Sequence, residues 1–550
     1  MSKKKSFLIV FFLLLIFIIG ILTGVFLLKK LPQEWFPSDN KNKIDMVLSI
    51  IEGDYVDTVD INELTEKAIP KIMAGLDPHS DYIPASDLLS MKENMDGHFG
   101  GIGIDCMLHL DTIVVISVTH GGPSEQAGIL AGDRIVTVND SIITSAFTSE
   151  EKIINTLKGP LGSSVKIGVK RGYSEEITDY TITRASIPLS TIKAAYEIAP
   201  GIGLIKIYDK FSHSTYDEFV MAMAKLLNKG CHSFIIDLRM NKGGAFDAAL
   251  KICNEFLSAG RRIVYTEGRT FPREEIIATG TGTLQENQIV ILVDQMSASA
   301  SEIVAGAIQD NDRGLIIGRK SFGKGLVQNQ IELSDGSALR LTVARYFTPS
   351  GRNIQRAYEM GRSDQYNQKW IDQLISGESF DQGTISPDTT QIFQTVGNRT
   401  VYGAGGIMPD IFVPVDTTEL TSYFMNLENN GIFHRFAFDY SDQNRDTLRK
   451  MNSYSEMLDY LETQPILYKI IHYAQERGIK RRSSLIHISS RKILNTTYAN
   501  ILHHFFGEEA FFEVYMKNDN VIKKAIEVIR NEAAYPQAIR SGKYLDYQPK

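Results

Sequence analysis

The chain has 550 residues, of which 43% are hydrophobic, and its formal net charge is −7. A chain of this length exceeds what one hydrophobic core accommodates, so we expect several domains. Nucleic-acid surfaces need clustered lysine and arginine, and the negative charge therefore argues against a nucleic-acid partner.

The beginning of the chain predicts a membrane segment. An uncharged, mostly apolar run covers residues 7–28 and ends at Lys29 and Lys30. This length suffices to cross a bilayer. Because no small-residue cleavage site follows the run, we expect an uncleaved anchor at residues 1–30. Lysines stand on both sides of it, so the charge bias that sets orientation is slight.

Residues 31–95 are expected to form a linker and an N-terminal helical segment, interrupted by the turn "GLDPHSDYIP". We interpret His79 in this turn as structural, because no second metal ligand stands at a workable spacing. Cys106, Cys231 and Cys253 match neither a zinc pattern nor a redox CxxC, which predicts small buried side chains. No metal site is predicted.

Residues 96–185 contain short β-like runs and the glycine-rich stretch "FGGIGI". Together with "AGILAGDRIVTVND", this stretch resembles a PDZ domain. The resemblance implies a loop whose backbone N–H groups bind a terminal carboxylate, beside a strand edge that accepts a peptide. The tail-binding residues it implies are Gly101, Ile102, Gly103 and Ile104.

The region 186–415 alternates apolar strand-like runs with helix-like runs, which is typical of an α/β sheet. Such sheets place their chemistry at strand-to-helix turns. Two turns stand out, "DLRMNKGG" and "DQMSASASE".

Ser299 in the second turn allows two interpretations. With Glu302 it matches the capping box S-x-x-E, in which the serine only caps a helix. The same position suits a nucleophile, because the first N–H groups of a helix and its dipole stabilise developing negative charge.

A nucleophilic serine needs a base. The chain has no G-x-S-x-G elbow and no histidine in a recognisable motif, so a lysine is the alternative. Lys324 lies in "SFGKGLVQ" between two glycines. A P-loop is excluded because Gly325 stands where the magnesium-binding Ser or Thr belongs, and an S-x-x-K helix is excluded by the same glycines.

These motifs, followed by "LTVARYFTPSGRNIQ" and "GGIMPDI", resemble the C-terminal processing peptidases, the tail-specific serine proteases, over residues 44–415. The resemblance implies Ser299 as nucleophile, Lys324 as general base and Gln328 as the residue that orients the lysine. The oxyanion hole would take backbone N–H groups of Ala300 and of Gly243 or Gly244. Ser297 and Ser301 would then be packing and capping hydroxyls.

The implied fold is an α/β core with crotonase- or ClpP-like layers of sheet and helices, an inserted PDZ β-barrel, the N-terminal transmembrane helix and a helical C-terminal extension at residues 416–550. The implied reaction needs no cofactor and acts on proteins or peptides with apolar C-terminal tails. We expect a single-pass protein of the bacterial inner membrane, with its catalytic domain in the periplasm.

Two features depart from the simplest family pattern. An insertion at about residues 357–403 is expected to decorate the core near the cleft. The helical extension carries no catalytic motif, which suggests packing or self-association into a homo-oligomer. The alternative function is a non-catalytic scaffold that binds protein tails through its PDZ domain and keeps a degenerate hydrolase core.

Overall fold

The computed structural model describes residues 20, 43–109, 112–143, 150–172, 174, 176–375, 377, 379–381 and 390–531. The chain divides into two compact units, residues 1–72 and 73–550. The first holds α2 (Lys43–Asp54) and most of α3 (Ile61–Met73). Among the described residues, no helix has both the length and the apolar character that crossing a membrane requires. The anchor predicted at residues 7–28 lies outside the described part, apart from residue 20.

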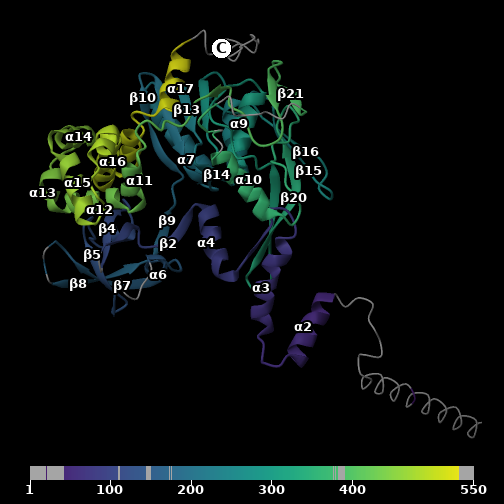
Figure 1. The fold of residues 1–550 in the computed structure, drawn as a ribbon, viewed down its shortest axis with the longest axis horizontal. Helices are drawn as coiled ribbons and strands as arrows, with labels where there is room; N and C mark the ends of the chain where they lie inside the picture. The colour runs from purple at the N-terminus through teal and green to yellow at the C-terminus, as the bar shows by residue number, and fades with distance from the viewer. Residues whose placement is uncertain are drawn as a thin grey trace, which may run out of the picture. The chain divides into compact units, whose positions relative to one another are not determined.

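A six-stranded sheet organises the part of the second unit that the sequence predicts to be the α/β core (Figure 1). Its order is β10-β11-β13-β17-β18-β23; β10 is antiparallel to β11, and the other neighbours are parallel. The α/β prediction is therefore confirmed. The strands are Ile192–Ala199, Ile202–Ile207, Ser233–Asp237, Gln288–Val293, Leu315–Gly318 and Ile411–Phe412.

Both faces of this sheet are covered by helices, which is why its strands are almost continuously apolar. Ile289 and Ile291 of β17 pack into the core shared with α7 (Thr215–Asn228), α8 (Phe246–Phe256) and α9 (Ala300–Asp310). Val290 and Leu292 point to the opposite face and pack with α17 (Asn520–Arg530). The last described helix of the chain thus completes the catalytic core.

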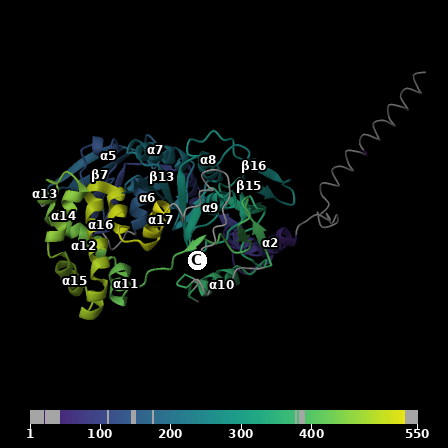
Figure 2. The ribbon, with the colours of Figure 1, turned by 90° about the horizontal axis from the view of Figure 1, so that it is seen from above.

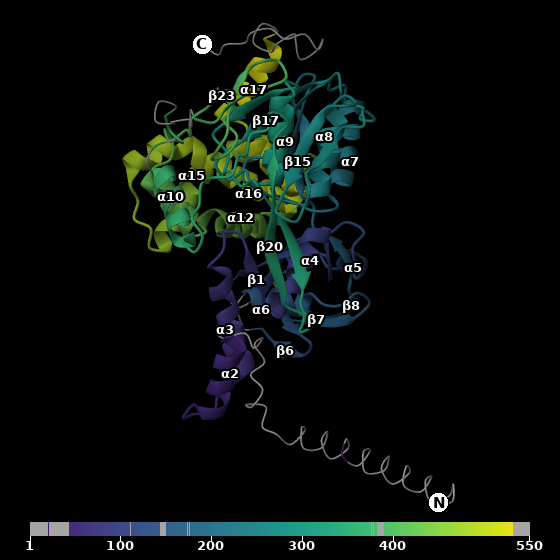
Figure 3. The ribbon, with the colours of Figure 1, turned by 90° about the vertical axis from the view of Figure 1, so that its right-hand side faces the viewer.

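A second sheet places the loop that carries Lys324. Its order is β1-β20-β15-β16, and β19 also pairs with β20. The long strand β20 runs beside β1 (Figure 3), and the two are antiparallel neighbours. The strands are β1 (Asp81–Ile83), β15 (Arg262–Glu267), β16 (Glu274–Ile277), β19 (Leu326–Glu332) and β20 (Ala338–Phe347).

Shorter elements complete the catalytic region. Strand β12 (Asp209–Phe211) pairs in parallel with β14 (Asn241–Gly244), the strand that contains the "NKGG" turn. The insertion predicted at about residues 357–403 contributes α10 (Ser363–Ile375) and the hairpin of β21 (Ile392–Gln394) and β22 (Thr400–Tyr402).

The region predicted as a PDZ domain contains a sheet with the order β3-β4-β5-β7-β8, in which β6 also pairs with β5. It follows α4 (Ala85–Asp96), and the pair β2 (His98–Gly101) and β9 (Ala185–Pro188) joins its two ends. The remaining elements are β3 (Ile104–His109), β4 (Thr112–Val118), α5 (Pro123–Gln126), β5 (Arg134–Val138), β6 (Ser141–Ile142), α6 (Glu150–Leu157), β7 (Ser164–Lys170) and β8 (Ile177–Thr183).

A cluster of helices follows the catalytic sheet in sequence and has a hydrophobic core of its own (Figure 2). The long helix α16 has non-helical dihedral angles at Gly507, where it kinks. The helices are α11 (Ser422–Asn429), α12 (Ile432–Gln443), α13 (Arg445–Leu448), α14 (Tyr454–Thr463), α15 (Ile466–Glu476) and α16 (Ser483–Tyr515).

Candidate active site

Ser299 is the N-cap residue of α9, at the turn that follows β17. Its φ of 53° and ψ of −112° lie in a region that non-glycine residues rarely adopt. Backbone strain of this kind costs about 1–3 kcal/mol and concentrates at functional sites. The side chain is half-buried, whereas its neighbours Ser297 and Ser301 are fully buried.

The two buried serines have structural partners. Ser297 Oγ donates to the carbonyl of Leu238 (2.9 Å). Ser301 Oγ lies 2.9 Å from Asn241 Oδ1 and 3.0 Å from the Asn241 carbonyl oxygen. Both hydroxyls therefore tie the serine turn to the "LRMN" segment, which leaves Ser299 as the serine that faces the cleft.

Lys324 lies in the loop between β18 and β19, and its Nζ donates to Gln328 Oε1 (2.8 Å). Burial, assisted by nearby Arg340, lowers the pKa of Lys324 to about 8, although Asp77 and Glu302 act in the opposite direction. The lysine therefore exists partly as the neutral amine near neutral pH, as a general base must.

Gln328 is anchored on its other side. It lies on β19, and its Nε2 donates to the backbone carbonyl of His79. The amide is thereby held with Oε1 toward Lys324. Burial, reinforced by Lys324, lowers the pKa of the His79 ring to about 4, so the ring is neutral. The backbone carbonyl of His79 thus contacts Gln328, the partner of Lys324. The sequence motifs did not predict this contact.

Glu302 joins the serine turn to the lysine loop. It accepts hydrogen bonds from the backbone N–H groups of Ser299 (2.9 Å), Gly323 (2.7 Å) and Lys324 (2.9 Å), and from Ser321 Oγ (2.5 Å). The carboxyl group is completely buried, and burial raises its pKa to about 7 against the effect of these donors. The helix cap expected from S-x-x-E is present, and the same side chain also fixes the loop of the base.

Tyr346 provides a second bridge between the two loops. Its Oη lies 2.5 Å from the carbonyl oxygen of Lys324 and 3.2 Å from that of Ser299. The residue is buried on β20, and burial raises its pKa well above the usual value, so it stays protonated as a donor.

The "NKGG" turn packs directly on Ser299. A Cβ on Gly243 would lie 2.6 Å from Ser299 Cβ and 2.9 Å from the nitrogen of Ala300, so only glycine fits there. The Gly243 N–H itself donates to Asn241 Oδ1 (2.9 Å). Of the two glycines predicted for the oxyanion hole, Gly243 therefore has its donor occupied in this arrangement, and Gly244 is the better candidate.

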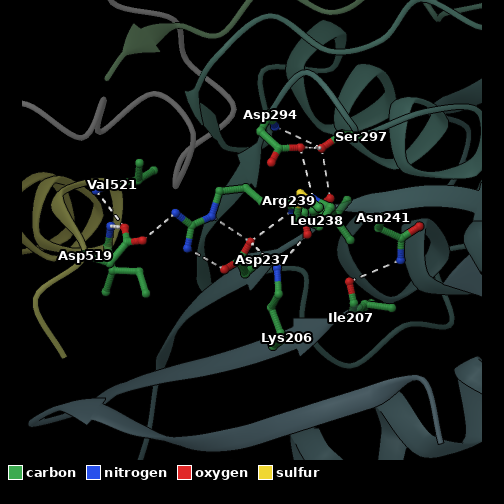
Figure 4. Close-up of polar contacts among 12 residues, drawn as sticks. Lys206, Ile207, Asp237, Leu238, Arg239, Asn241, Asp294, Ser297, Asp519 and Val521 are labelled. Atoms are coloured by element: carbon green, nitrogen blue, oxygen red, sulfur yellow. Dashed lines mark hydrogen bonds and ion pairs between the residues drawn. The ribbon is translucent and has the colours of Figure 1, made fainter. Parts of the chain in front are cut away.

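A buried ion network supports this turn from behind (Figure 4). Arg239, just before the turn, pairs with Asp237 (2.7 Å) and with Asp519 (2.8 Å), and Lys206 pairs with Asp237 (3.0 Å). Burial opposes ionisation of Asp237, but Arg239 and Lys206 prevail and hold its pKa below the usual value. Asp519 comes from the C-terminal region, which sequence reasoning did not connect with the site.

Ser299, Ala300, Gly243, Gly244, Lys324 and Gln328 all line one cleft of about 1030 Å³. Its far wall includes α4, and its apolar lining includes Phe246, Ile303 and Leu326. Among the described residues, Lys324 Nζ donates to Gln328 Oε1, and no hydrogen bond joins it to Ser299 Oγ. Within the described residues, no group of three or more His, Cys, Asp or Glu could hold a metal ion.

The predicted PDZ residues run from Gly101 at the end of β2 to Ile104 at the start of β3. Ile102 is 2% exposed and packs in the PDZ core, so only its backbone could meet a ligand. Gly103 has a φ of 75°, which glycine adopts without strain. Within the described part of the chain, β3 pairs only with β4, so its other edge can accept a peptide.

Comparison with known proteins identifies the family. A model of peptidase family S41 matches residues 201–360, and a PDZ-domain model matches residues 100–181. A carboxy-terminal-processing protease of Bartonella bacilliformis is 36% identical over 310 residues, which cover 56% of this chain and 70% of that protein. The chain belongs to peptidase family S41.

A second curated relative agrees with this assignment. A probable CtpA-like serine protease of Staphylococcus aureus is 30% identical over 441 residues, covering 75% of this S41 peptidase and 84% of the relative. The photosystem II D1 C-terminal processing protease is 28% identical, covering 56% of this chain and 89% of that chain, with a TM-score of 0.31. A model of a family of unknown function matches residues 423–507.

The S41 assignment confirms the predicted class of enzyme, a serine peptidase with a PDZ domain, over the alternative of a non-catalytic scaffold. Sequence reasoning missed Tyr346 and the second role of Glu302. The S-x-x-E pattern could have drawn attention to Glu302. Tyr346 carries no comparable signal, because its role depends on the pairing of β19 with β20.

Proposed function

We propose that this S41 peptidase cleaves protein substrates near or from their C-termini, with Ser299 as nucleophile and Lys324 as general base. The observation that carries the proposal is the half-buried Ser299 in a strained turn, in one cleft with a lysine whose pKa burial lowers to about 8. Gln328 holds this lysine.

The reaction begins when neutral Lys324 Nζ turns from Gln328 and takes the proton of Ser299 Oγ. The oxygen attacks the scissile carbonyl carbon, and the resulting tetrahedral intermediate carries its negative charge on the former carbonyl oxygen. The Lys324 ammonium then protonates the leaving amine, and an acyl-enzyme remains on Ser299. Water, deprotonated by the same lysine, hydrolyses the ester and regenerates the enzyme.

The oxyanion donors are the N–H groups of Ala300 and Gly244. Ala300 is the first residue of α9, where the helix dipole adds positive potential. One such donor contributes about 2.7–4 kcal/mol to transition-state stabilisation in other acyl-transfer enzymes. Gly243 would join them only after its N–H leaves Asn241 Oδ1.

The PDZ domain recognises the substrate's C-terminal tail by adding it to the edge of β3, with the Gly101–Gly103 loop near the terminal carboxylate. The apolar cleft residues Phe246, Ile303 and Leu326 favour apolar side chains next to the scissile bond. The names of the Bartonella and photosystem relatives, which refer to C-terminal processing, support this substrate class.

We further propose that residues 7–28 anchor the enzyme as a single-pass protein in a bacterial inner membrane, with the catalytic region in the periplasm. The support is the uncharged apolar run of the sequence, which is long enough to span a bilayer.

The test is turnover of an unfolded protein with an apolar C-terminus by the full chain in detergent. Ser299→Ala should lower cleavage by about 10³-fold or more with the fold preserved. Lys324→Ala should match it, and the double variant should be hardly worse, because the two residues act as one unit.

Ser297→Ala is the matched control and should retain most activity, since the Ser297 hydroxyl bonds to the Leu238 carbonyl and the Asp294 N–H and does not line the cleft. If Ser299 were merely a cap, Ser299→Ala would cost about 0.5–2 kcal/mol of stability and leave turnover intact. That result would refute the proposed nucleophile.

A further inference from the structure

Helix α10, in the insertion between "GRNIQ" and "GGIMPDI", buries one tyrosine beside the catalytic loops. Tyr366 is 4% exposed. Its Oη lies 3.2 Å from His79 Nε2, and the two rings meet edge to face with centroids 5.3 Å apart. The lowered pKa of His79 keeps the ring neutral, and in the tautomer that carries its proton on Nδ1, Nε2 accepts a hydrogen bond from the Tyr366 hydroxyl.

From His79 the contacts continue to the general base. The His79 carbonyl accepts from Gln328 Nε2, and Gln328 Oε1 accepts from Lys324 Nζ. The Tyr366 hydroxyl is thus connected to Lys324 through one histidine and one glutamine.

A second route reaches the other side of Lys324. Gln355 Nε2 lies 3.4 Å from Tyr366 Oη, and Gln355 Oε1 accepts from the N–H of Gly325 (2.9 Å). The directions are consistent, because the hydroxyl donates its one proton to His79 and accepts from Gln355. The Tyr366 hydroxyl therefore contacts two residues, His79 and Gln355, that hydrogen-bond to Gln328 and to Gly325 of the lysine loop.

Aromatic side chains of the same helix hold an arginine against this loop. The Arg356 guanidinium lies 4.3 Å from the Phe322 ring centroid, 4.2 Å from that of Tyr366 and 6.0 Å from that of Trp370. Its backbone N–H donates to the Gly323 carbonyl (3.0 Å).

The aromatic rings of Phe322, Tyr366 and Trp370 are the main contacts of the Arg356 guanidinium. Arg356 is 9% exposed, and its Nε and Nη2 have no hydrogen-bond partner among the described residues. Trp370 also packs edge to face on Phe322, with centroids 5.5 Å apart. Phe322 and Gly323 directly precede Lys324. Residues of α10 therefore pack against the loop that carries Lys324.

We propose that α10 is a positioning element for the general base: Tyr366 and Trp370 hold His79, Gln355 and Arg356 against the lysine loop, so that Lys324 Nζ is kept desolvated and in reach of Ser299. This inference rests on the proposed function, since it assigns α10 a role in the same Ser299–Lys324 chemistry. Tyr366 and Trp370 are positioning residues, because neither lines the cleft.

The charged groups that act on Lys324 are Arg340 from β20, Asp77 from the segment before β1, and Glu302 from α9. Arg356 and the neutral His79 stand behind the loop. None of these charges belongs to α10. A substitution in α10 therefore changes the pKa of Lys324 through the position and hydration of its amine. The charged groups around Lys324 stay the same.

The experiment measures kcat, KM and the pH profile on a small activated ester, which needs no PDZ contact, with the full chain in detergent. Tyr366→Ala should lower kcat by about 100-fold, as expected for a misplacement of about 1 Å, with KM little changed. The alkaline rise of kcat/KM should move to a pH above its wild-type midpoint, because Lys324 becomes more hydrated.

Tyr366→Phe keeps the ring on Arg356 and removes only the hydroxyl, so it should lose about 10-fold in kcat and shift the midpoint in the same direction. This near-isosteric variant keeps the test valid if Tyr366→Ala does not fold. Asn367→Ala, at an exposed position of the same helix, is the matched control and should behave as wild type.

The inference is overturned if folded Tyr366→Phe and Tyr366→Ala keep the wild-type kcat and pH midpoint. It is equally overturned if they lose activity with an unmoved midpoint, as a merely structural defect would cause. If the proposed function were wrong, the wild-type enzyme would show no turnover, or its turnover would not change in Ser299→Ala. That result would also refute the role of α10.

Discussion

At the scale of single residues, the pH dependence of this peptidase follows from Lys324. A lysine in water has a pKa of about 10.4, and burial lowers that of Lys324 to about 8. The proposed role of Lys324 as general base requires the neutral amine, so kcat/KM on a small ester should rise as the pH increases through about 8. A profile that is flat between pH 6 and 10 would contradict the assignment of the base.

Two substitutions with opposite signs test the cause of this pKa. Arg340 lowers the pKa of Lys324, so Arg340→Gln should move the midpoint of the pH profile to higher pH. Asp77 raises it, so Asp77→Asn should move the midpoint to lower pH. Shifts in the same direction would show that general loosening of the site, rather than charge, controls the lysine.

The resemblance to the C-terminal processing peptidases predicted that Ser299, Lys324 and Gln328 belong together, and the structure places all three in one cleft. The sequence could not show that Asn241 occupies the N–H of Gly243, since this bond depends on the conformation of the turn. It also could not reveal that Glu302 bonds both catalytic loops, because its partners come from another part of the chain. Motifs specify chemistry, whereas side-chain geometry needs the folded chain.

At the scale of elements, α17 shows the limit of reasoning from periodicity. Its helical pattern was visible, and the sequence placed it in a C-terminal extension. A pattern of apolar residues indicates that a face is buried without indicating what covers it. The structure packs α17 on the catalytic sheet, where it fills the face opposite α7, α8 and α9.

Deletion of the chain from Asp519 onward should therefore prevent folding of the catalytic region. The helix buries Val521, Ile522, Val528 and Ile529, and burying such side chains contributes about 1.5–3 kcal/mol each. Their sum, about 6–12 kcal/mol, is comparable with the whole stability of a typical protein. A truncated chain that stays soluble and cleaves substrate would contradict this prediction.

Asp519→Asn is a milder test of the same element. Asparagine keeps the Oδ1 acceptor that caps α17 but loses the ion pair with Arg239, which should cost about 1.5–3 kcal/mol in the free energy of unfolding measured with urea. Lys517→Ala, at an exposed position just before the helix, is the control and should change stability by less than about 0.5 kcal/mol.

At the scale of the whole second unit, the C-terminal helices contact both the catalytic sheet and the PDZ domain. On the sheet side, Glu509 pairs with Lys225 (2.7 Å) and accepts from the N–H of Ala195 (3.2 Å). On the PDZ side, Asp442 pairs with Arg134 (2.9 Å), and Phe438 packs with Val114 and Ile116. The C-terminal helices therefore contact both the PDZ domain and the elements of the catalytic sheet.

The final prediction concerns this arrangement. Arg445 of α13 donates to the Ala131 carbonyl (2.7 Å) and covers Gly132, where any Cβ would collide with its guanidinium. Combining Arg445→Ala with Phe438→Ala should free the PDZ domain and remove the effective concentration that a fixed tail-binding domain gives the bound substrate. We expect KM for a tail-bearing protein to rise about 10-fold or more, while turnover of a small ester stays near wild type. Arg435→Ala, at an exposed position of α12, is the control. Equal losses on both substrates would mean that the helices only stabilise the catalytic core, and a KM unchanged on the tail substrate would mean that PDZ docking does not contribute to cleavage.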